Sequence, residues 1–283
     1  MTTVSVIIPS YNRAHTLPRA LNSVIAQTRA ADEIIVVDDG STDDTEQLIA
    51  KNYPQVIYLK QQNLGVSAAR NLAIQHAHGE WLALLDSDDA WLPQKLEKQL
   101  SLLAEQPAFK IIHSDEIWIR NGVRVNQMKK HAKCGGWIFQ HCLPLCAISP
   151  SAVIIHRDLL AQIGLFDETL PACEDYDLWL RITAHHPVLY CNEALITKYG
   201  GHEDQLSQQH WGMDRFRIRA LNKCIKQSKL NKQDHLAAEQ MLQHKLRVLL
   251  KGAKKHNNQK IIEEFSPFLQ ASNHSLITKT HSK

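Results

Sequence analysis

The chain has 283 residues and a mass of 32.2 kDa, enough for one large domain or for a domain with an appendage. Its composition, with 44% hydrophobic and 22% charged residues, excludes a collagen-like or wholly disordered chain. The net charge of +3 conceals an asymmetry, because residues 1–210 carry 17 Lys and Arg against 24 Asp and Glu, whereas residues 211–283 carry 15 against 5. We therefore expect the two parts to meet different partners.

The six cysteines form no paired framework, so we expect reduced thiols in a cytosolic compartment. Cys134, Cys142 and Cys146 with His141 suggest zinc, but their spacing matches no tight zinc knuckle, which favours ordinary thiols. No stretch approaches the ~18 apolar residues of a membrane span, and no signal-peptide pattern opens the chain. These features predict a cytoplasmic protein.

Short runs rich in Val, Ile and Leu alternate with amphipathic stretches through the first 92 residues. Such runs suit strands buried on both faces of a parallel sheet. The predicted strands are Val4–Ile8, Ile34–Val37, Val56–Leu59 and Trp81–Leu85. The predicted helices are Thr16–Ala26, Asp43–Lys51 and Val66–His76, the second opened by a capping box of Ser41 and Asp44. This order predicts an α/β fold with a doubly wound, mostly parallel sheet flanked by helices.

The second part of the chain mixes strands and helices before it becomes wholly helical. The predicted strands are Ile111–Ile119, Val123–Gln127, Ser151–His156, Val188–Cys191 and Leu195–Tyr199, with an Asn121-Gly122 hairpin turn. The predicted helices run from Pro93 to Glu105, over Tyr176–His185, and over 209–228, 232–255 and 259–270. We therefore predict an α/β domain over 1–208, with halves 1–92 and 93–208, and a basic helical extension over 209–283.

Polar residues follow three of the early strands. These segments are Pro9–Arg13, Asp38–Ser41 and Asp86–Asp89. Open α/β sheets bind ligands outside the carboxyl ends of their strands, so the segments should meet at one edge. Crowded carboxylates are costly without a cation among them, and Mg²⁺ or Mn²⁺ prefers carboxylate and phosphate oxygens. The alternative is that the acidic residues only form turns, with Asp89 as a solvated helix cap.

Four segments, Val4–Arg13, Val36–Asp43, Leu64–Asn71 and Leu85–Trp91, resemble the successive motifs of family 2 glycosyltransferases. The resemblance covers about residues 1–207. It implies the GT-A fold and an inverting, metal-dependent transfer of sugar from a nucleotide donor. In these terms residues 1–92 are the nucleotide-binding half and residues 93–208 the acceptor half.

The resemblance assigns a set of residues to the nucleotide sugar. They are Pro9, Tyr11, Arg13, Asp38, Asp39, Gly65, Arg70, Asp86 and Ser87. Asp39 matches the carboxylate that accepts a hydrogen bond from a uracil-type base, and Asp38 is its neighbour or a strand-end turn residue. Arg70 lies near the nucleotide or is a helix-surface cation. We expect Ser41, Thr42 and Asp43 to be caps.

The resemblance also assigns residues to the metal ion and to the acceptor. Asp88, Asp86 and His202 are the predicted ligands of Mn²⁺ or Mg²⁺, the histidine having a surface role as its alternative. Asp175 matches the general base and Glu174 supports the acceptor side. The alternative for this acidic pair is a favourable interaction with a helix N-terminus. Trp179 and Arg181 fit core packing and a buried partner.

The expected reaction is inverting transfer of a hexosyl or N-acetylhexosaminyl group, with UDP as the expected nucleotide, to a saccharide or lipid-linked acceptor. The expected role is the synthesis of a cell-surface polysaccharide or glycolipid. The alternative is a non-catalytic nucleotide-sugar-binding or scaffold protein. No G-x-G-x-x-G follows the first strand, which argues against a dinucleotide oxidoreductase.

The basic extension has several interpretations. Sparse aromatic residues argue against nucleic acid as a partner. Arg215, Arg217, Arg219, Lys223, Lys226 and Lys229 suit contact of 209–260 with an anionic membrane at the cytoplasmic face. A solvated helix face or a homodimer surface is the alternative.

Overall fold

The structure, a computed structural model, describes residues 2–201 and 211–280, with side chains up to residue 269. Its centre is a nine-stranded sheet in the order β3-β2-β1-β4-β8-β6-β9-β5, with β7 paired to β6. The strands are β1 (Val4–Ser10), β2 (Glu33–Asp38), β3 (Ile57–Lys60), β4 (Trp81–Leu84), β5 (Ala90–Trp91), β6 (Ile111–Arg120), β7 (Val123–Val125), β8 (Ile154–His156) and β9 (Leu189–Gly200). Because β1 to β4, β6 and β9 run in one direction, the sheet is mostly parallel, as predicted.

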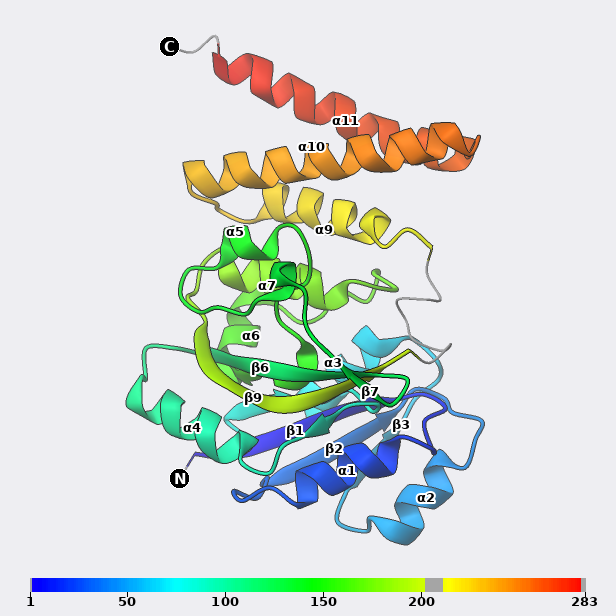
Figure 1. Cartoon of the computed structure of the whole chain (residues 1–283), viewed down its shortest axis with the longest axis vertical. Helices are drawn as coiled ribbons and strands as arrows, with labels where there is room; N and C mark the ends of the chain where they lie inside the picture. Colours follow the sequence, from blue (N-terminus) through cyan, green and yellow to red (C-terminus); the bar gives the residue numbers. More distant parts are fainter. Residues whose placement is uncertain (1, 202–210, 281–283) are drawn as a thin grey trace.

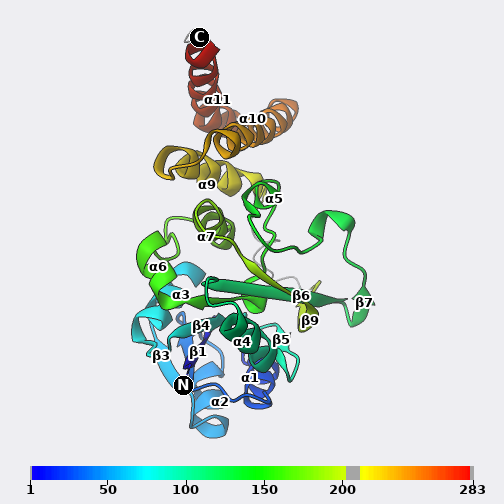
Figure 2. The same cartoon turned by 90° about the vertical axis from the view of Figure 1, so that its left-hand side faces the viewer.

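Helices cover both faces of this sheet (Figures 1 and 2). They are α1 (Leu17–Ile25), α2 (Thr45–Asn52), α3 (Val66–His76), α4 (Lys95–Glu105), α5 (Phe139–Cys142), α6 (Arg157–Ile163), α7 (Glu174–Thr183), α9 (Asp214–Gln227), α10 (Lys232–Lys255) and α11 (Gln259–Thr280). Successive side chains of a strand point to opposite faces. Val6 and Ile8 of β1 therefore pack with α1, α2 and α4, whereas Ile7 packs in the cluster that contains α3, α6 and α7.

The predicted elements are present, with several boundary differences. The two predicted strands 188–191 and 195–199 form one strand, β9, which pairs with β6 across a register shift near Asp115. The strand predicted from Ser151 begins at Ile154, because Pro150–Ala152 forms a 3-10 turn. Helix α7 begins at Glu174, two residues before the predicted start, which places the acidic pair in its first turn.

The C-terminal helices stack outward from α7 in the order α9, α10 and α11 (Figure 1). Phe216 and Leu221 of α9 and Leu246 of α10 belong to the same hydrophobic cluster as Trp179 and Leu180 of α7. The extension therefore shares its core with the α/β layer. The boundary predicted near residue 208 lies in 202–210, outside the described residues. None of the described helices combines the length and the apolar character needed to cross a membrane.

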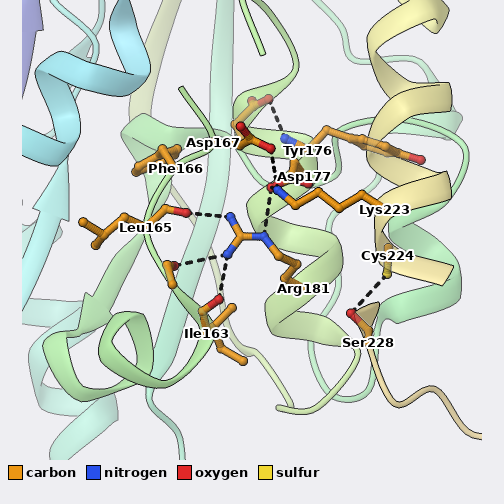
Figure 3. A network of polar contacts seen from close by, with 12 residues as sticks. Ile163, Leu165, Phe166, Asp167, Tyr176, Asp177, Arg181, Lys223, Cys224 and Ser228 are labelled. Atoms are coloured by element: carbon orange, nitrogen blue, oxygen red, sulfur yellow. Dashed lines mark hydrogen bonds and ion pairs between the residues drawn. The ribbon is translucent and has the colours of Figure 1, made fainter. Parts of the chain in front are cut away.

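Charged side chains reinforce the packing of α7 on α9 (Figure 3). Lys223 Nζ donates to Asp167 Oδ2 (2.6 Å) and to Asp177 Oδ2 (3.1 Å). Arg181 Nε donates to the same Asp177 oxygen (2.9 Å), and its Nη atoms donate to backbone carbonyls of the segment 163–165. Lys223 thus stabilises the fold from within, contrary to its prediction as a surface or membrane-facing cation. Trp179 and Arg181 have the predicted core and partner roles.

Candidate active site

A cavity of about 490 Å³ opens where the carboxyl ends of β1, β2 and β4 meet. Its lining residues from the first 92 positions are Pro9, Ser10, Tyr11, Arg13, Asp39, Asn63, Gly65, Val66, Ala69, Arg70, Asp86, Ser87, Asp88 and Asp89. Those from the rest of the chain are Cys146, Pro150, Cys173, Glu174, Asp175, Lys198, Tyr199, Met213 and Arg217. Among the described residues, the cavity thus unites every predicted site residue except Asp38. His202 lies outside the described residues.

Asp38 ends β2 with its side chain directed into the fold. Its Oδ1 accepts the backbone N–H of Ser41 (2.7 Å), and its Oδ2 accepts the hydroxyl of Tyr58 (2.5 Å). Burial, together with this carboxylate, raises the pKa of Tyr58, so the phenol remains a donor. These contacts agree with the alternative interpretation of Asp38 as a strand-end turn residue.

Asp39 faces the cavity and organises the loop before α3. Its Oδ1 accepts the N–H of Leu64 (2.8 Å), and its Oδ2 accepts the N–H of Gly65 (2.9 Å). Gly65 has a φ of +95°, and a Cβ atom there would meet nothing within 4 Å. This residue therefore combines a left-handed backbone with open space, which allows a ligand to approach the start of α3 closely.

The loop after β1 is bound to the loop after β2. Tyr11 is 45% exposed at the cavity, and the next residue, Asn12, has a left-handed φ of +52°. The N–H of Asn12 donates to Ser41 Oγ (2.8 Å), while Asn12 Oδ1 accepts the N–H of Thr42 (2.8 Å). The capping-box prediction is wrong, because α2 has Asp44 at its N-cap and Ser41 holds the Asn12 loop.

Arg70 of α3 connects the two acidic motifs. Its side chain is 4% exposed, and its Nη2 donates to Asp86 Oδ1 (2.7 Å) and its Nη1 to Glu174 Oε1 (2.6 Å). Burial alone would lower the pKa of Arg70, but the two carboxylates raise it. Burial and Asp175 raise the pKa of Glu174, and Arg70 opposes that rise. The alternative of a helix-surface cation is wrong, since Arg70 is a buried bridge.

Asp89 is buried beneath the cavity, which contradicts its interpretation as a solvated helix cap. It is 2% exposed, and its oxygens accept the hydroxyl of Ser151 (2.6 Å) and the N–H of Tyr199 (3.1 Å). Burial raises the pKa of Asp89 to about 8, although Lys198 acts in the opposite direction. The carboxyl group thus hydrogen-bonds the segment after β4 to β9 and to the turn at Ser151.

Asp175 receives a hydrogen bond on each carboxylate oxygen. Tyr176 N–H donates to Oδ1 (2.7 Å), and the thiol of Cys146 donates to Oδ2 (3.0 Å). Burial, together with Asp175, raises the pKa of Cys146 well above its usual range, which keeps the thiol protonated as a donor. Sequence reasoning did not assign Cys146 this role, because its partner lies in a separate helix.

The residue before the acidic pair has an unusual backbone conformation. Cys173 has a φ of +62° at the N-cap of α7 and lines the cavity. A left-handed non-glycine residue costs roughly 1–3 kcal/mol, and such strain is concentrated at functional sites. This turn directs Glu174 and Asp175 toward the cavity from the first turn of the helix.

Two cations at the cavity were missed as site residues. Lys198 of β9 contacts Ser149 Oγ (3.3 Å), and Asp89, Glu116 and Asp86 raise its pKa although burial lowers it. Arg217 of α9 reaches the cavity and donates to Asp214 Oδ1 (3.0 Å). The strand pattern around Lys198 does not indicate that this residue reaches a cavity. The basic face of α9 suggested a solvent or membrane role for Arg217.

The acidic residues suit a divalent cation in part. Asp86 and Asp88 supply hard carboxylate oxygens at the cavity, which is the ligand chemistry of Mg²⁺ and Mn²⁺. The described residues contain no group of three or more His, Cys, Asp or Glu side chains that could hold a metal ion. Two carboxylates leave further coordination positions of such an ion to ligand oxygens and water. Cys134, Cys142 and Cys146 do not form a group of this kind within the described part of the chain either.

Comparisons with known proteins cover the first half of the chain with a family model and two thirds or more of it with relatives. The model of the family "Glycosyl transferase family 2" matches residues 5–138. The Escherichia coli protein WfgD, a UDP-Glc:alpha-D-GlcNAc-diphosphoundecaprenol beta-1,3-glucosyltransferase, is 33% identical over 217 residues, which are 76% of this chain and 81% of WfgD. An uncharacterized glycosyltransferase of Rickettsia prowazekii is 31% identical over 68% of this chain, and the match spans 62% of its length. A relative from Rickettsia conorii is 30% identical over 74% of this chain, and only 35% of its length is spanned.

Solved structures show the same fold. TarS 1-349 of S. aureus in complex with UDP-GlcNAc has a TM-score of 0.68 and 23% identity, covering 87% of this chain and 72% of that one. The mannosyltransferase PcManGT of Pyrobaculum calidifontis, with GDP-Man and Mn²⁺, has a TM-score of 0.62 and 17% identity, covering 95% and 84%. These likenesses confirm the GT-A-type α/β fold with its C-terminal helices. The family model and the sequence relatives show that the chain belongs to glycosyltransferase family 2.

Proposed function

We propose that this protein transfers a sugar from UDP to an acceptor hydroxyl with inversion at the anomeric carbon. The observation that carries the proposal is the Arg70 bridge, because it joins Asp86 after β4 to Glu174 at the start of α7. Donor-side and acceptor-side motifs thereby border one cavity. The expected product is a cell-surface polysaccharide or glycolipid, and the transferred group is a hexosyl or N-acetylhexosaminyl unit.

The donor would lie along the carboxyl ends of β1 and β2. Tyr11 presents an exposed ring beside Asp39, whose carboxylate can accept the imide N–H of uracil. The glucosyltransferase activity of WfgD with UDP-Glc and the UDP-GlcNAc bound to TarS support a UDP-linked donor. The N-terminal turn of α3 at Gly65 favours the negative charge of a diphosphate.

Asp86 and Asp88 would hold Mg²⁺ or Mn²⁺, whose charge offsets the negative charge of the diphosphate when the ion is bound. Arg70 holds Asp86 in place through its hydrogen bond of 2.7 Å. Lys198 and Arg217 add positive charge at the same cavity.

Asp175 is the proposed general base. The acceptor hydroxyl gives its proton to Asp175 as its oxygen bonds to the anomeric carbon, and the bond from that carbon to the diphosphate breaks. Attack on the face opposite the leaving group inverts the centre. Tyr176 N–H and the Cys146 thiol orient the base by binding one carboxylate oxygen each.

The test measures the transfer of labelled sugar from UDP-glucose and from UDP-GlcNAc in the presence of Mn²⁺. Water and saccharides serve as the acceptors. Asp175→Asn should lower turnover by ~10²–10⁴, the usual contribution of a general base, while UDP still binds. Full turnover in this variant would contradict the base assignment. Binding of UDP-sugar without turnover in the wild type would instead favour a non-catalytic binding protein.

A further inference from the structure

A second hollow opens on the C-terminal helices beside the cavity. This α9–α10 groove has a volume of about 360 Å³. The lining residues used below are Trp211, Met213, Arg217, Val248, Leu249 and Gly252. In Figure 1 the start of α9 runs beneath the C-terminal half of α10. Residues from the start of α9 and from the C-terminal half of α10 line the groove.

The groove adjoins the catalytic cavity, because Met213 and Arg217 line both hollows. On the cavity side of these two residues lie Cys173 and Asp175, which belong to the proposed acceptor side. The groove therefore lies next to the position at which an acceptor hydroxyl would react.

The groove is apolar and open to water. Trp211 is 57% exposed and Val248 is 54% exposed, although both are large hydrophobic side chains. Leu249 and Gly252 continue this apolar lining on α10. Exposed apolar surface beside a functional cavity is characteristic of a binding site.

Positive charge lies where the groove meets the cavity and along its outer rim. Arg217 stands at the junction, and its Nε is buried without a hydrogen-bond partner among the described residues. Arg215 packs beside Trp211, with 5.3 Å between its guanidinium and the ring centroid. Arg247 and Lys251, which flank Val248 on α10, are exposed. The Asp214 carboxylate also lines the groove and accepts a hydrogen bond from Arg217 Nη1 (3.0 Å). The chemistry is thus apolar surface next to guanidinium groups, one of which is paired with a carboxylate.

We propose that the α9–α10 groove binds the lipid part of an amphiphilic acceptor, one that carries a phosphate or diphosphate between its sugar and its hydrocarbon chain. The chain would lie on Trp211, Val248 and Leu249, and the phosphate would meet Arg217 at the junction. The acceptor sugar would then extend to Asp175. This proposal rests on the proposed function for the role of the cavity.

The test uses farnesyl diphosphate as the probe, titrated calorimetrically into the full chain with excess UDP present to fill the donor site. Val248→Glu places a charge among the apolar contacts and should weaken binding about tenfold, which corresponds to about 1.4 kcal/mol. Trp211→Ala should weaken binding to a similar extent. Leu236→Glu is the matched control, because Leu236 is 45% exposed on the same helix but does not line the groove.

Inorganic diphosphate tests the phosphate contact alone, and farnesol tests the hydrocarbon contact alone. Both should bind more weakly than farnesyl diphosphate. Equal affinities of the Val248→Glu and Leu236→Glu proteins would overturn the proposal, as would displacement of the probe by UDP. Loss of binding to anionic vesicles with unchanged affinity for the probe would also overturn it, since the groove would then be a membrane contact. Absence of sugar release from UDP-sugars, with the probe results as expected, would refute the proposed function and leave the groove as a lipid-phosphate site.

Discussion

Replacement of Arg70 by methionine tests the bridge between the two halves of the site. The side chain is 4% exposed and is bonded to two carboxylates, Asp86 and Glu174, of which Glu174 is 6% exposed. Removal of one partner from a buried ion pair typically costs about 3–5 kcal/mol, because a buried charge stays uncompensated. That cost is a large fraction of a domain's total stability of about 5–15 kcal/mol.

The loss of stability in the Arg70→Met protein should grow as the pH rises. Burial and Asp175 raise the pKa of Glu174, and Arg70 opposes that rise, so the pKa should be higher still in the Arg70→Met protein. A carboxyl group whose pKa is raised on folding stabilises fully below its unfolded pKa, and this contribution is lost as pH rises through the folded value. The deficit of the variant should therefore be smaller at about pH 5 than at about pH 8.

Urea denaturation followed by circular dichroism measures the free energy of unfolding at each pH, and so gives both the loss of stability and its pH dependence. Lys98→Met is the matched control, because Lys98 and Glu193 form an exposed pair with side chains 33% and 54% accessible. Such pairs contribute about 0–1 kcal/mol. Arg70→Lys should recover part of the loss, since an ammonium keeps the charge but not the forked geometry. An Arg70→Met protein as stable as the Lys98→Met protein at both pH values would refute the bridge.

Three further changes test single contacts of the site. Cys146→Ala should lower sugar transfer roughly three- to tenfold, the value of one hydrogen bond, and Cys146→Ser should restore most of it; equal rates in both variants would exclude a positioning role. Asp89→Asn should be less stable than wild type by no more than about 1 kcal/mol near pH 6 and should gain on it as pH rises from there to about 8, because burial raises the pKa of Asp89 to about 8 and the wild type loses stability with rising pH until that folded pKa is passed; parallel urea midpoints across this range would contradict that shift. Asp88→Ala should weaken UDP binding about tenfold with Mn²⁺ present and little without it, measured by calorimetry, so an equal loss in both conditions would argue against a metal ligand.

The sheet and its carboxyl edge were predictable from sequence because their signals are local. Apolar runs of four or five residues end before Pro9, Asp38 and Asp86, and in a parallel sheet such ends meet at one edge. Asp39 and Asp88 could therefore be placed at the cavity before the fold was known. The capping prediction at Ser41 failed because a tertiary contact with Asn12 uses the hydroxyl that a cap would need.

The missed residues depend on contacts between distant segments. Arg70 was predicted to lie near the nucleotide or on the helix surface, and its role as a buried bridge depends on Glu174 and on Phe166, whose ring centroid lies 5.1 Å away. Lys198 reaches the cavity through the pairing of β9 with β6. Arg217 does so because the apolar residues of α9 pack on α7. The basic segment, which the sequence motifs do not reach, thus contributes directly to the cavity.

The arrangement of charges explains how so many carboxylates coexist in one cavity. Arg70 binds one member of each acidic motif, Asp86 and Glu174, and so compensates buried charge on both sides of the site. We assign the cation to Asp86 together with Asp88, and the proton to Asp175, the neighbour of Glu174. Because one guanidinium holds both motifs, a change in the position of α3 would shift the proposed metal ligand and base together. The bridge therefore links the position of the proposed metal ligand Asp86 to that of Glu174, beside the proposed base.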